Sequence, residues 1–460
     1  MTRQTIVAGA GLLLFVIALF AVRESNRHVA QERPHRLQQL VQEMGLRPLR
    51  PPPAQDPALV ALGEALFFEE ALSGNRDISC ATCHHPTLAF GDGLPLSIGP
   101  GGTGLGPARQ PDPERPLVPR NAISLANVGQ AEWDSLFWDG RVQALAGGEL
   151  RTPAGSHLPA GLDGALAALA MFPVTFRDEM RGGWYDVAGY SLQPGASLDA
   201  DSHEAKAGGW HDADIYGQPN ELAAFGNDAD QLPLIWQALM DRLLARPDYR
   251  ELFGAAYPRL APETLAFQHA ANALAAYETQ AFVVVDTSWD RFLAGDDGAL
   301  SPEEVSGALL FYGDAGCAAC HSGDLLSDQA FHNIGAPQFG PGRDEDAPLD
   351  YGRWHVTGNA ADRFAFRTPA LRGVALTGPW LHNGAYDSLE EVVRQHLDPP
   401  RALRGYDGAS LPPNLRATLQ DEPVTIKAML QTLDPLLAEP RRLSAREVDE
   451  IVAFLKALGE

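Results

Sequence analysis

Apolar residues along the chain recur at helical spacing in several separate stretches. A helix is predicted to begin at Asp56 and Pro57, an N-cap and a first-turn proline, and to continue through Phe68. A second, alanine-rich helix is expected around residues 265–277. No segment shows the sustained alternation of a strand, so the pattern predicts a mainly α-helical protein.

Two further helix starts carry the capping-box signature, in which a serine is followed three residues later by a glutamate. They are Ser301 with Glu304 and Ser444 with Glu447. An apolar stripe follows the second start and consists of Val448, Ile451, Val452, Leu455 and Leu458. This stripe indicates a helix that packs against a core.

An almost unbroken apolar run occupies residues 6–22, between Arg3 and Arg23. Its length lies between that of a signal-peptide core and that of a membrane span. No small-residue cleavage site follows it, which favours an uncleaved membrane anchor over residues 1–24. Residues 25–54 are polar and then proline-rich, and are interpreted as a stiff tether. A signal peptide or an anchor would each export the rest of the chain.

Two stretches of the chain are similar to each other, and each contains the motif C-x-x-C-H preceded by G-x-x-L-F-aromatic. The motif residues are Cys80, Cys83 and His84 in the first stretch, and Cys317, Cys320 and His321 in the second. Two thiols at this spacing can form thioether bonds to the vinyl groups of one haem, while the histidine binds its iron. The sequence therefore predicts two haem c sites.

The alternatives for these motifs are a redox dithiol, a zinc knuckle and coincidence. All four cysteines of the protein fall in the two motifs, and a histidine follows each pair. Zinc would need two further ligands at each site, and a redox dithiol needs no histidine. Two covalently bound haems c are therefore the preferred interpretation.

The length of the chain bears on its number of domains, and its net charge bears on the class of its partners. A chain of 460 residues is too long for one compact core. We expect an N-terminal haem domain over 55–285, with an irregular insertion at about 181–231, and a C-terminal haem domain over 286–460. The net charge of −24 argues against nucleic acid and anionic membrane surfaces as partners. This negative charge indicates either a small basic electron carrier as the partner or a surface that only keeps the protein soluble.

Candidate axial ligands to iron are unevenly distributed. Between Pro86 and Ser156 the chain contains no His, Met, Tyr, Lys or Cys. This segment therefore cannot supply a strong second axial ligand to the first haem. The insertion carries His203 and His211, which are expected at the surface.

Taken in order, the motifs resemble the bacterial di-haem cytochrome c peroxidase family, including its relatives that oxidise protein tryptophans during methylamine dehydrogenase maturation. The matching elements run from Leu62 to the C-terminus and include LSGN at 72–75, SIG at 97–99, RNA at 120–122, FWDGR at 137–141, PVTFRDEM at 173–180, FHNIG at 331–335, FRTPALRGV at 366–374 and GPWLHNGAYDSLEEVV at 378–393. The resemblance implies two cytochrome c-like haem domains.

The resemblance also implies a calcium ion between the domains, held partly by backbone carbonyls. The matching positions are Asn121, Thr377 and Pro379, and carbonyl oxygens suit Ca²⁺. Without the resemblance these residues would be assigned to turns. Trp138 occupies the family's position between the haems, where an aromatic ring can relay an electron, although a buried tryptophan is otherwise a core residue.

Two positions depart from the usual peroxidase pattern. Where many family members have a histidine after SIG, this chain has Pro100, which cannot bind iron. We therefore expect the haem on His84 to keep an open distal face in all redox states, so that peroxide binds without a preceding reduction.

The second departure lies in the motif SLEEVVRQHL at 388–397, where the family has methionine, or tyrosine in the tryptophan-oxidising relatives. Here the position is occupied by His396. His321 and His396 would bind the second haem from opposite sides and give it a lower potential than a His/Met pair. The alternative is a histidine on the surface of a helix.

The family uses a glutamate shortly before a methionine as the acid/base for peroxide cleavage, and Glu179 before Met180 is the best match. Its spacing from FWDGR is longer than usual, and the glutamine often found between them has no clear counterpart.

These observations predict a periplasmic di-haem c peroxidase, anchored to the inner membrane, that reduces hydrogen peroxide to water. Its electrons would come from a small carrier, a cytochrome c or cupredoxin, and would enter at the C-terminal haem, while peroxide would bind at the N-terminal haem. Two alternatives stay open: a peroxide-dependent oxidase of a protein or organic substrate, and a non-catalytic di-haem electron carrier. A homodimer is also left open.

Overall fold

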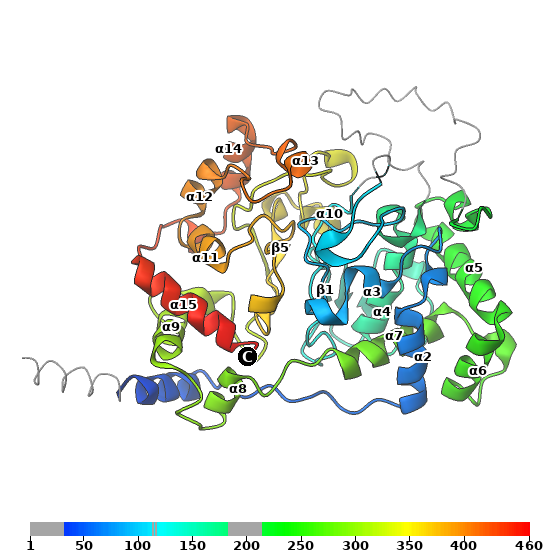
Figure 1. The fold of residues 1–460 in the computed structure, drawn as a ribbon, viewed down its shortest axis with the longest axis horizontal. Helices are drawn as coiled ribbons and strands as arrows, with labels where there is room; N and C mark the ends of the chain where they lie inside the picture. The colour runs from blue at the N-terminus through cyan, green and yellow to red at the C-terminus, as the bar shows by residue number, and fades with distance from the viewer. Residues whose placement is uncertain (1–31, 113–114, 116, 183–213) are drawn as a thin grey trace, which may run out of the picture.

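The computed structural model describes residues 32–112, 115, 117–182 and 214–460, so the apolar run at 6–22 and the two insertion histidines, His203 and His211, lie outside the described residues. Helices joined by long irregular segments build most of the described chain, which confirms the predicted mainly α-helical fold. Figure 1 shows two groups of elements side by side, which we name the N-terminal half (residues 55–285) and the C-terminal half (residues 286–460).

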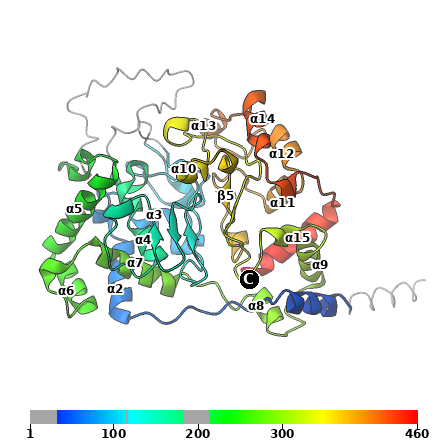
Figure 2. The same cartoon turned by 180° about the vertical axis from the view of Figure 1, so that it is seen from behind.

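The described helices of the N-terminal half are α2 (Pro57–Phe67), α3 (Cys80–Cys83), α4 (Ala165–Ala170), α5 (Leu232–Ala245), α6 (Pro247–Ala256) and α7 (Phe267–Ala281). Those of the C-terminal half are α8 (Ser288–Leu293), α9 (Pro302–Tyr312), α10 (Trp354–Thr357), α11 (Leu389–Leu397), α12 (Pro399–Gly405), α13 (Pro413–Arg416), α14 (Pro423–Gln431) and α15 (Ala445–Ala457). Figure 2 shows α5 and α6 at the outer edge of the molecule, away from the C-terminal half.

The strands are only two or three residues long. β1 (Ser135–Leu136), β2 (Val142–Ala144) and β3 (Leu150–Arg151) form one antiparallel sheet, while β4 (Phe331–His332) pairs with β5 (Phe366–Arg367) in a second. Both sheets lie where the two halves face each other, and they position the turn at 137–140 that is described below.

Three predicted helix starts are found in the structure. Asp56 accepts hydrogen bonds from the backbone N–H groups of Ala58 and Leu59 and begins α2. The capping boxes at Ser301 and Ser444 begin α9 and α15. The predicted alanine-rich helix begins two residues later than the first residue of its apolar pattern, because Leu265 still belongs to the preceding turn.

The repeated G-x-x-L-F-aromatic pattern marks the same helix crossing in both halves. A Cβ atom on Gly63 of α2 would lie 1.9 Å from the carbonyl oxygen of Ala273 on α7. A Cβ atom on Gly307 of α9 would lie 1.8 Å from the carbonyl oxygen of Glu450 on α15. Each glycine therefore permits a backbone contact that any side chain would prevent, and the helix that it allows to approach leads into a C-x-x-C-H motif.

Each half has its own hydrophobic core. The first contains Phe67, Phe172 and Trp236, and the second contains Trp289 and Phe454. A third, smaller cluster joins the halves and consists of Leu96, Ile98, Leu117, Phe339, Ala385, Tyr386, Leu411 and Leu415. The loop that carries the SIG motif is therefore packed against the C-terminal half.

A buried ion pair also joins the halves. Arg120, 4 % exposed, donates two hydrogen bonds to Asp350 of the C-terminal half, at 2.6 and 2.8 Å, and one to Asp139 at 2.7 Å. The removal of one partner would leave an uncompensated buried charge, which typically costs about 3–5 kcal/mol.

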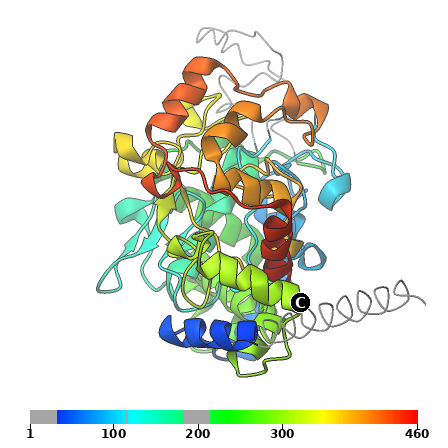
Figure 3. The ribbon, with the colours of Figure 1, turned by 90° about the vertical axis from the view of Figure 1, so that its left-hand side faces the viewer.

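The tether expected over residues 25–54 requires a correction for its described part. Residues 32–43 form a helix, and Leu37 and Val41 on it are buried in the core of the C-terminal half. The Nε2 atom of Gln38 donates to the carbonyl of Phe292, and the N–H of Leu49 donates to Asp290. Figure 3 shows this helix in blue beside α8 and α9. Apolar residues at helical spacing within the polar segment explain why it docks.

Candidate haem-binding sites

The first C-x-x-C-H motif occupies the short helix α3 and the residue after it. Burial raises the pKa of the Cys80 and Cys83 thiols and lowers that of the His84 imidazole, because these side chains lie inside the N-terminal half. The Nδ1 atom of His84 lies 3.1 Å from the carbonyl oxygen of Phe90. Because a carbonyl can only accept, Nδ1 carries the proton and Nε2 keeps its lone pair for a metal.

The second motif repeats this arrangement. The Nδ1 atom of His321 lies 3.1 Å from the carbonyl oxygen of Leu326. His396 projects from α11, and its Nδ1 atom lies 2.8 Å from the carbonyl oxygen of Val392, one turn earlier on the same helix. Both histidines therefore present a free Nε2 atom, and burial lowers the pKa of each imidazole, that of His321 to about 4.

The distance between these two rings matches bis-histidine ligation of one iron. The ring centroids of His321 and His396 lie 6.3 Å apart. With metal–nitrogen bonds of about 2 Å and ring centroids a further ~1 Å away, two imidazoles on opposite sides of one metal ion would have centroids about 6 Å apart. His396 also lines an internal cavity beside His321, which favours ligation over the surface-histidine alternative.

A large cavity surrounds the pair. It encloses about 240 Å³, many times the ~15 Å³ that one water requires. The residues that line it include Cys317, Cys320, His321, His396, Phe311, Leu389, Val393 and Leu455. Two thiols, the His321 and His396 imidazoles and a mainly apolar wall fit a covalently attached haem, whose ring is apolar and whose iron takes nitrogen ligands.

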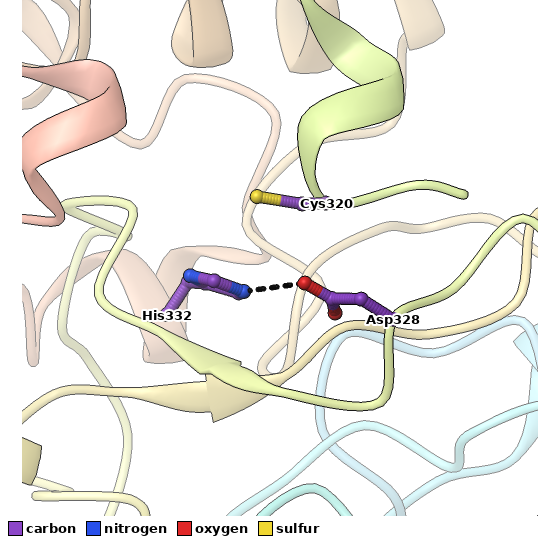
Figure 4. A group of neighbouring side chains, drawn as sticks. All are labelled: Cys320, Asp328 and His332. Carbon is purple, nitrogen blue, oxygen red and sulfur yellow. Dashed lines mark hydrogen bonds and ion pairs between the residues drawn. The ribbon is translucent and has the colours of Figure 1, made fainter.

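A histidine held by two carboxylates lies at the edge of this cavity. Figure 4 shows His332 facing Asp328, with Cys320 close to the two. Its Nε2 atom lies 3.0 Å from Asp328 and its Nδ1 atom 2.6 Å from Asp434. Because both ring nitrogens contact carboxylates, this group is interpreted as an ion-paired histidine beside the haem cavity.

The loop that contains Pro100 is fixed by one buried arginine. Arg109, 4 % exposed, donates to the carbonyl oxygens of Ile98, Gly99 and Gly104, each at 2.9 Å. Pro100 itself is buried. The guanidinium group thus holds the backbone on both sides of the position where many family members carry a histidine ligand.

Glu179 lies in a single π-helical turn, Arg177–Arg181, that touches this loop. A Cβ atom on Gly99 would lie 1.8 Å from the carbonyl oxygen of Asp178, so only glycine permits this contact. Burial and the neighbouring Asp178 raise the pKa of Glu179 to about 7, although Arg141 opposes the shift. The charge of Glu179 also contributes to the raised pKa of Cys83, so the carboxyl group lies near the first haem-attachment motif.

Trp138 belongs to the N-terminal half and lines the cavity that contains His321 and His396. The indole is 9 % exposed, and its Nε1–H donates to the backbone carbonyl of Asn121 at 2.9 Å. The three residues matched to the calcium site, Asn121, Thr377 and Pro379, line the same cavity. The structure therefore brings the tryptophan and these three residues together from both halves.

Sequence reasoning missed several residues of these sites. Arg109, His332 and the arginines Arg353 and Arg367, which bind the turn at Trp138, were not predicted. No local pattern distinguishes them, because a guanidinium that binds backbone carbonyls has the same sequence signature as a surface arginine.

The structure contains two C-x-x-C-H sites, one in each half, and comparisons with known proteins identify the family to which the chain belongs. The profile of the family described as "Di-haem cytochrome c peroxidase" matches residues 57–206 and 212–298. The chain therefore belongs to the di-haem cytochrome c peroxidase family, whose members are oxidoreductases with two haems c.

Curated relatives cover most of the chain. Cytochrome-c peroxidase IdrP1 of Denitromonas iodatirespirans is 31% identical over 378 residues, which span 76% of each chain. Methylamine utilization protein MauG of Methylorubrum extorquens is 28% identical over 403 residues, 87% of this chain and 78% of the relative. Cytochrome c551 peroxidase of Pseudomonas aeruginosa is 27% identical over 336 residues, 72% of this chain and 69% of the relative.

Solved structures show the same fold. A MauG-like protein associated with microbial copper homeostasis has a TM-score of 0.55 at 25% identity, covering 89% of this chain and 93% of the other. The diheme peroxidase BthA from Burkholderia thailandensis has a TM-score of 0.52 at 21% identity, with coverage of 89% and 86%.

Proposed function

We propose that this protein reduces hydrogen peroxide at its N-terminal haem, with electrons that enter at its C-terminal haem. The bound haems would supply the redox chemistry, in which one H₂O₂, two electrons and two protons give two waters. His84 would be the sole protein ligand to the first iron, and His321 and His396 would bind the second from opposite sides. Trp138 would relay electrons between the two sites.

The placement of Glu179 carries this proposal. A carboxyl group with a pKa of about 7 is ionised and protonated in similar amounts near neutral pH. It can therefore accept the proton of the inner peroxide oxygen and return it to the leaving oxygen. Because its turn is in contact with the loop of Pro100, the acid/base and the open coordination position would lie on the same side of the first haem.

The source of the electrons would be a small redox protein, a cytochrome c or a cupredoxin. A net charge of −24 favours a basic partner through long-range attraction. The donor would act outside the cytoplasm, because haem c is attached there, and we propose the periplasm as the location. None of the helices in the described ranges is long and apolar enough to span a membrane, and an anchor at residues 1–24 is part of the proposal.

A calcium ion between the halves is also proposed. Asn121, Thr377 and Pro379 would contribute oxygen ligands from the cavity wall, and a hard cation suits such ligands. Treatment with a calcium chelator should slow electron transfer between the haems, and Ca²⁺ but not Mg²⁺ should restore it. An unchanged rate in metal-depleted protein would remove calcium from the proposal.

The first experiment is electron paramagnetic resonance of the ferric protein, before and after the addition of peroxide. We expect one high-spin haem and one low-spin bis-histidine haem, with a rapid change of the high-spin signal. Steady-state assays should then show two moles of reduced cytochrome c oxidised per mole of H₂O₂. Two low-spin haems that do not respond to peroxide would favour a non-catalytic electron carrier.

A second candidate is a peroxide-dependent oxidase of a protein or organic substrate. Pro100 and the similarity to MauG over 87% of this chain favour it. It predicts that peroxide is consumed without a reduced donor when a suitable substrate is present. The peroxidase proposal predicts that a reduced donor is sufficient.

A further inference from the structure

The turn that carries Trp138 is held by the opposite half of the molecule. Four consecutive carbonyl oxygens, those of residues 137–140, all accept hydrogen bonds from two arginines of the C-terminal half. Arg367 binds the carbonyl of Phe137 through Nε at 3.0 Å and that of Trp138 through its backbone N–H at 2.7 Å. Arg353 binds the carbonyls of Asp139 and Gly140 through Nη1, each at 2.9 Å.

Further contacts hold the Arg353 side chain in place for this interaction. It is 7 % exposed, its guanidinium lies 4.0 Å above the ring centroid of Phe331, and its Nη2 atom donates to Gln143 at 2.8 Å. It lies outside the lining of the haem cavity, whereas Arg367 is part of that lining. A buried guanidinium that binds carbonyls of the other half fixes their position more firmly than a surface ion pair would.

The backbone of the turn adopts a left-handed conformation at Phe137, which is unfavourable for a bulky residue. Phe137 has a φ angle of 64° and Gly140 one of 65°. A bulky residue in this left-handed region persists only where its surroundings fix it. At Gly140 a Cβ atom would lie 2.3 Å from the ring of Phe331 and 2.7 Å from Nη1 of Arg353, so the backbone fits closely against the C-terminal half.

The indole of Trp138 is held from the other side as well. Its Nε1–H donates to the carbonyl of Asn121, and the N–H of Asn121 donates to the carbonyl of His382 at 2.8 Å. The backbone and the ring of Trp138 are therefore both tied to a cavity wall built mainly by the C-terminal half.

We propose that Arg353 and Arg367 are positioning residues for Trp138, which keep the indole in place for electron transfer between the two haem sites. This inference rests on the proposed relay through Trp138. In each step one electron would pass from the reduced C-terminal site to the oxidised N-terminal site, and the donor protein would replace it. The two arginines would take no part in the reaction of peroxide itself.

The test uses the full-length protein with both haems and the variant Arg353→Gln, because Arg353 does not line the haem cavity. Stopped-flow absorbance of the reduced protein mixed with peroxide separates the reaction at the N-terminal haem from the subsequent oxidation of the C-terminal haem. We expect the first phase to stay within about twofold of wild type and the second to slow by about tenfold or more. Arg353→Lys should recover part of the rate, since an ammonium group can donate to one or both carbonyls.

The matched control is Arg363→Gln. Arg363 lies on the same segment and stacks on Tyr351 and Trp354, without a bond to the turn. It should leave both phases unchanged. An unchanged second phase in Arg353→Gln would overturn the positioning role, and so would an equal loss of both phases in Arg353→Gln and Arg353→Lys.

Trp138→Phe distinguishes this inference from the proposed function. If Trp138→Phe slows the second phase and Arg353→Gln does not, the relay stands and the positioning role fails. If Trp138→Phe leaves the second phase unchanged, the relay itself fails and the positioning role is lost with it.

Discussion

His321 and His396 face each other across an apolar cavity, with ring centroids 6.3 Å apart and both Nδ1 atoms hydrogen-bonded to backbone carbonyls. The two rings come from sequence positions 75 residues apart, the difference between 396 and 321. Each is fixed in the tautomer that leaves Nε2 free. These two free nitrogens would hold one iron from opposite sides, and the first prediction depends on this proposed role.

Replacement of His396 by methionine should raise the reduction potential of the C-terminal haem, because a thioether favours reduced iron. The expected increase is on the order of 100 mV, measured by spectroelectrochemical titration. His396→Ala should instead produce a second high-spin ferric signal. A potential and spin state that do not respond to either change would show that His396 is not an axial ligand.

The Glu179→Gln variant should bind both haems, and its turnover with peroxide should be lower by about a hundredfold or more, since the amide cannot carry the proton.

In the wild-type protein the rate constant for the reaction with peroxide should fall as the pH drops below about 7. Burial and Asp178 raise the pKa of Glu179 to about 7, and its ionised form must accept the first proton. Glu390→Gln on the exposed face of α11 is the control and should behave as wild type.

Asp178→Asn provides an independent check on that pH dependence. The charge of Asp178 contributes to the raised pKa of Glu179, so its removal should move the acidic limb of the rate profile to lower pH. If the acidic limb of the pH–rate profile does not move in Asp178→Asn, a group other than Glu179 controls the proton transfer.

Pro100→His should place an imidazole at the position where many family members have one. Because Arg109 binds the carbonyls of Gly99 before residue 100 and Gly104 after it, we expect the ferric N-terminal haem to become low-spin and to lose its rapid reaction with peroxide. Pro100→Ala supplies no ligand and should remain high-spin. Electron paramagnetic resonance of the two variants would show the difference, and a high-spin Pro100→His protein would count against an open site at this position.

The buried Glu278 on α7 should make the thermal stability of the protein depend on pH. It is 4 % exposed, and burial raises its pKa to about 8 from an ordinary value of 4.5. A raised pKa means that the folded state binds the proton more tightly, so this stabilisation is complete below pH 4.5 and is lost as the pH rises through about 8. Glu278→Gln should therefore raise the melting temperature relative to wild type at pH 9 but not at pH 5.

Thermal unfolding followed by circular dichroism at both pH values would measure this effect, with the exposed Glu251→Gln of α6 as the control. An equal shift at both pH values would mean that the change acts through packing and not through ionisation.

Local sequence determined a large part of this protein. Asp56, Ser301 and Ser444 set helix starts through hydrogen bonds within a few residues, and these are visible in any short segment. The C-x-x-C-H spacing depends on covalent geometry, so it predicted two haem motifs without knowledge of the fold. Position within a family motif also led to His396 as a ligand, which stays a prediction, and the structure places its ring 6.3 Å from that of His321.

Only the tertiary structure decided which distant groups meet. The sequence places Leu37 and Val41 at helical spacing in the segment predicted as a tether, but it does not show the surface of α8 and α9 against which they pack. The Trp138 turn depends on Arg353 and Arg367, more than two hundred residues away. A carbonyl oxygen carries no sequence signature, so the arginine that will bind it becomes apparent only when folding brings the two together.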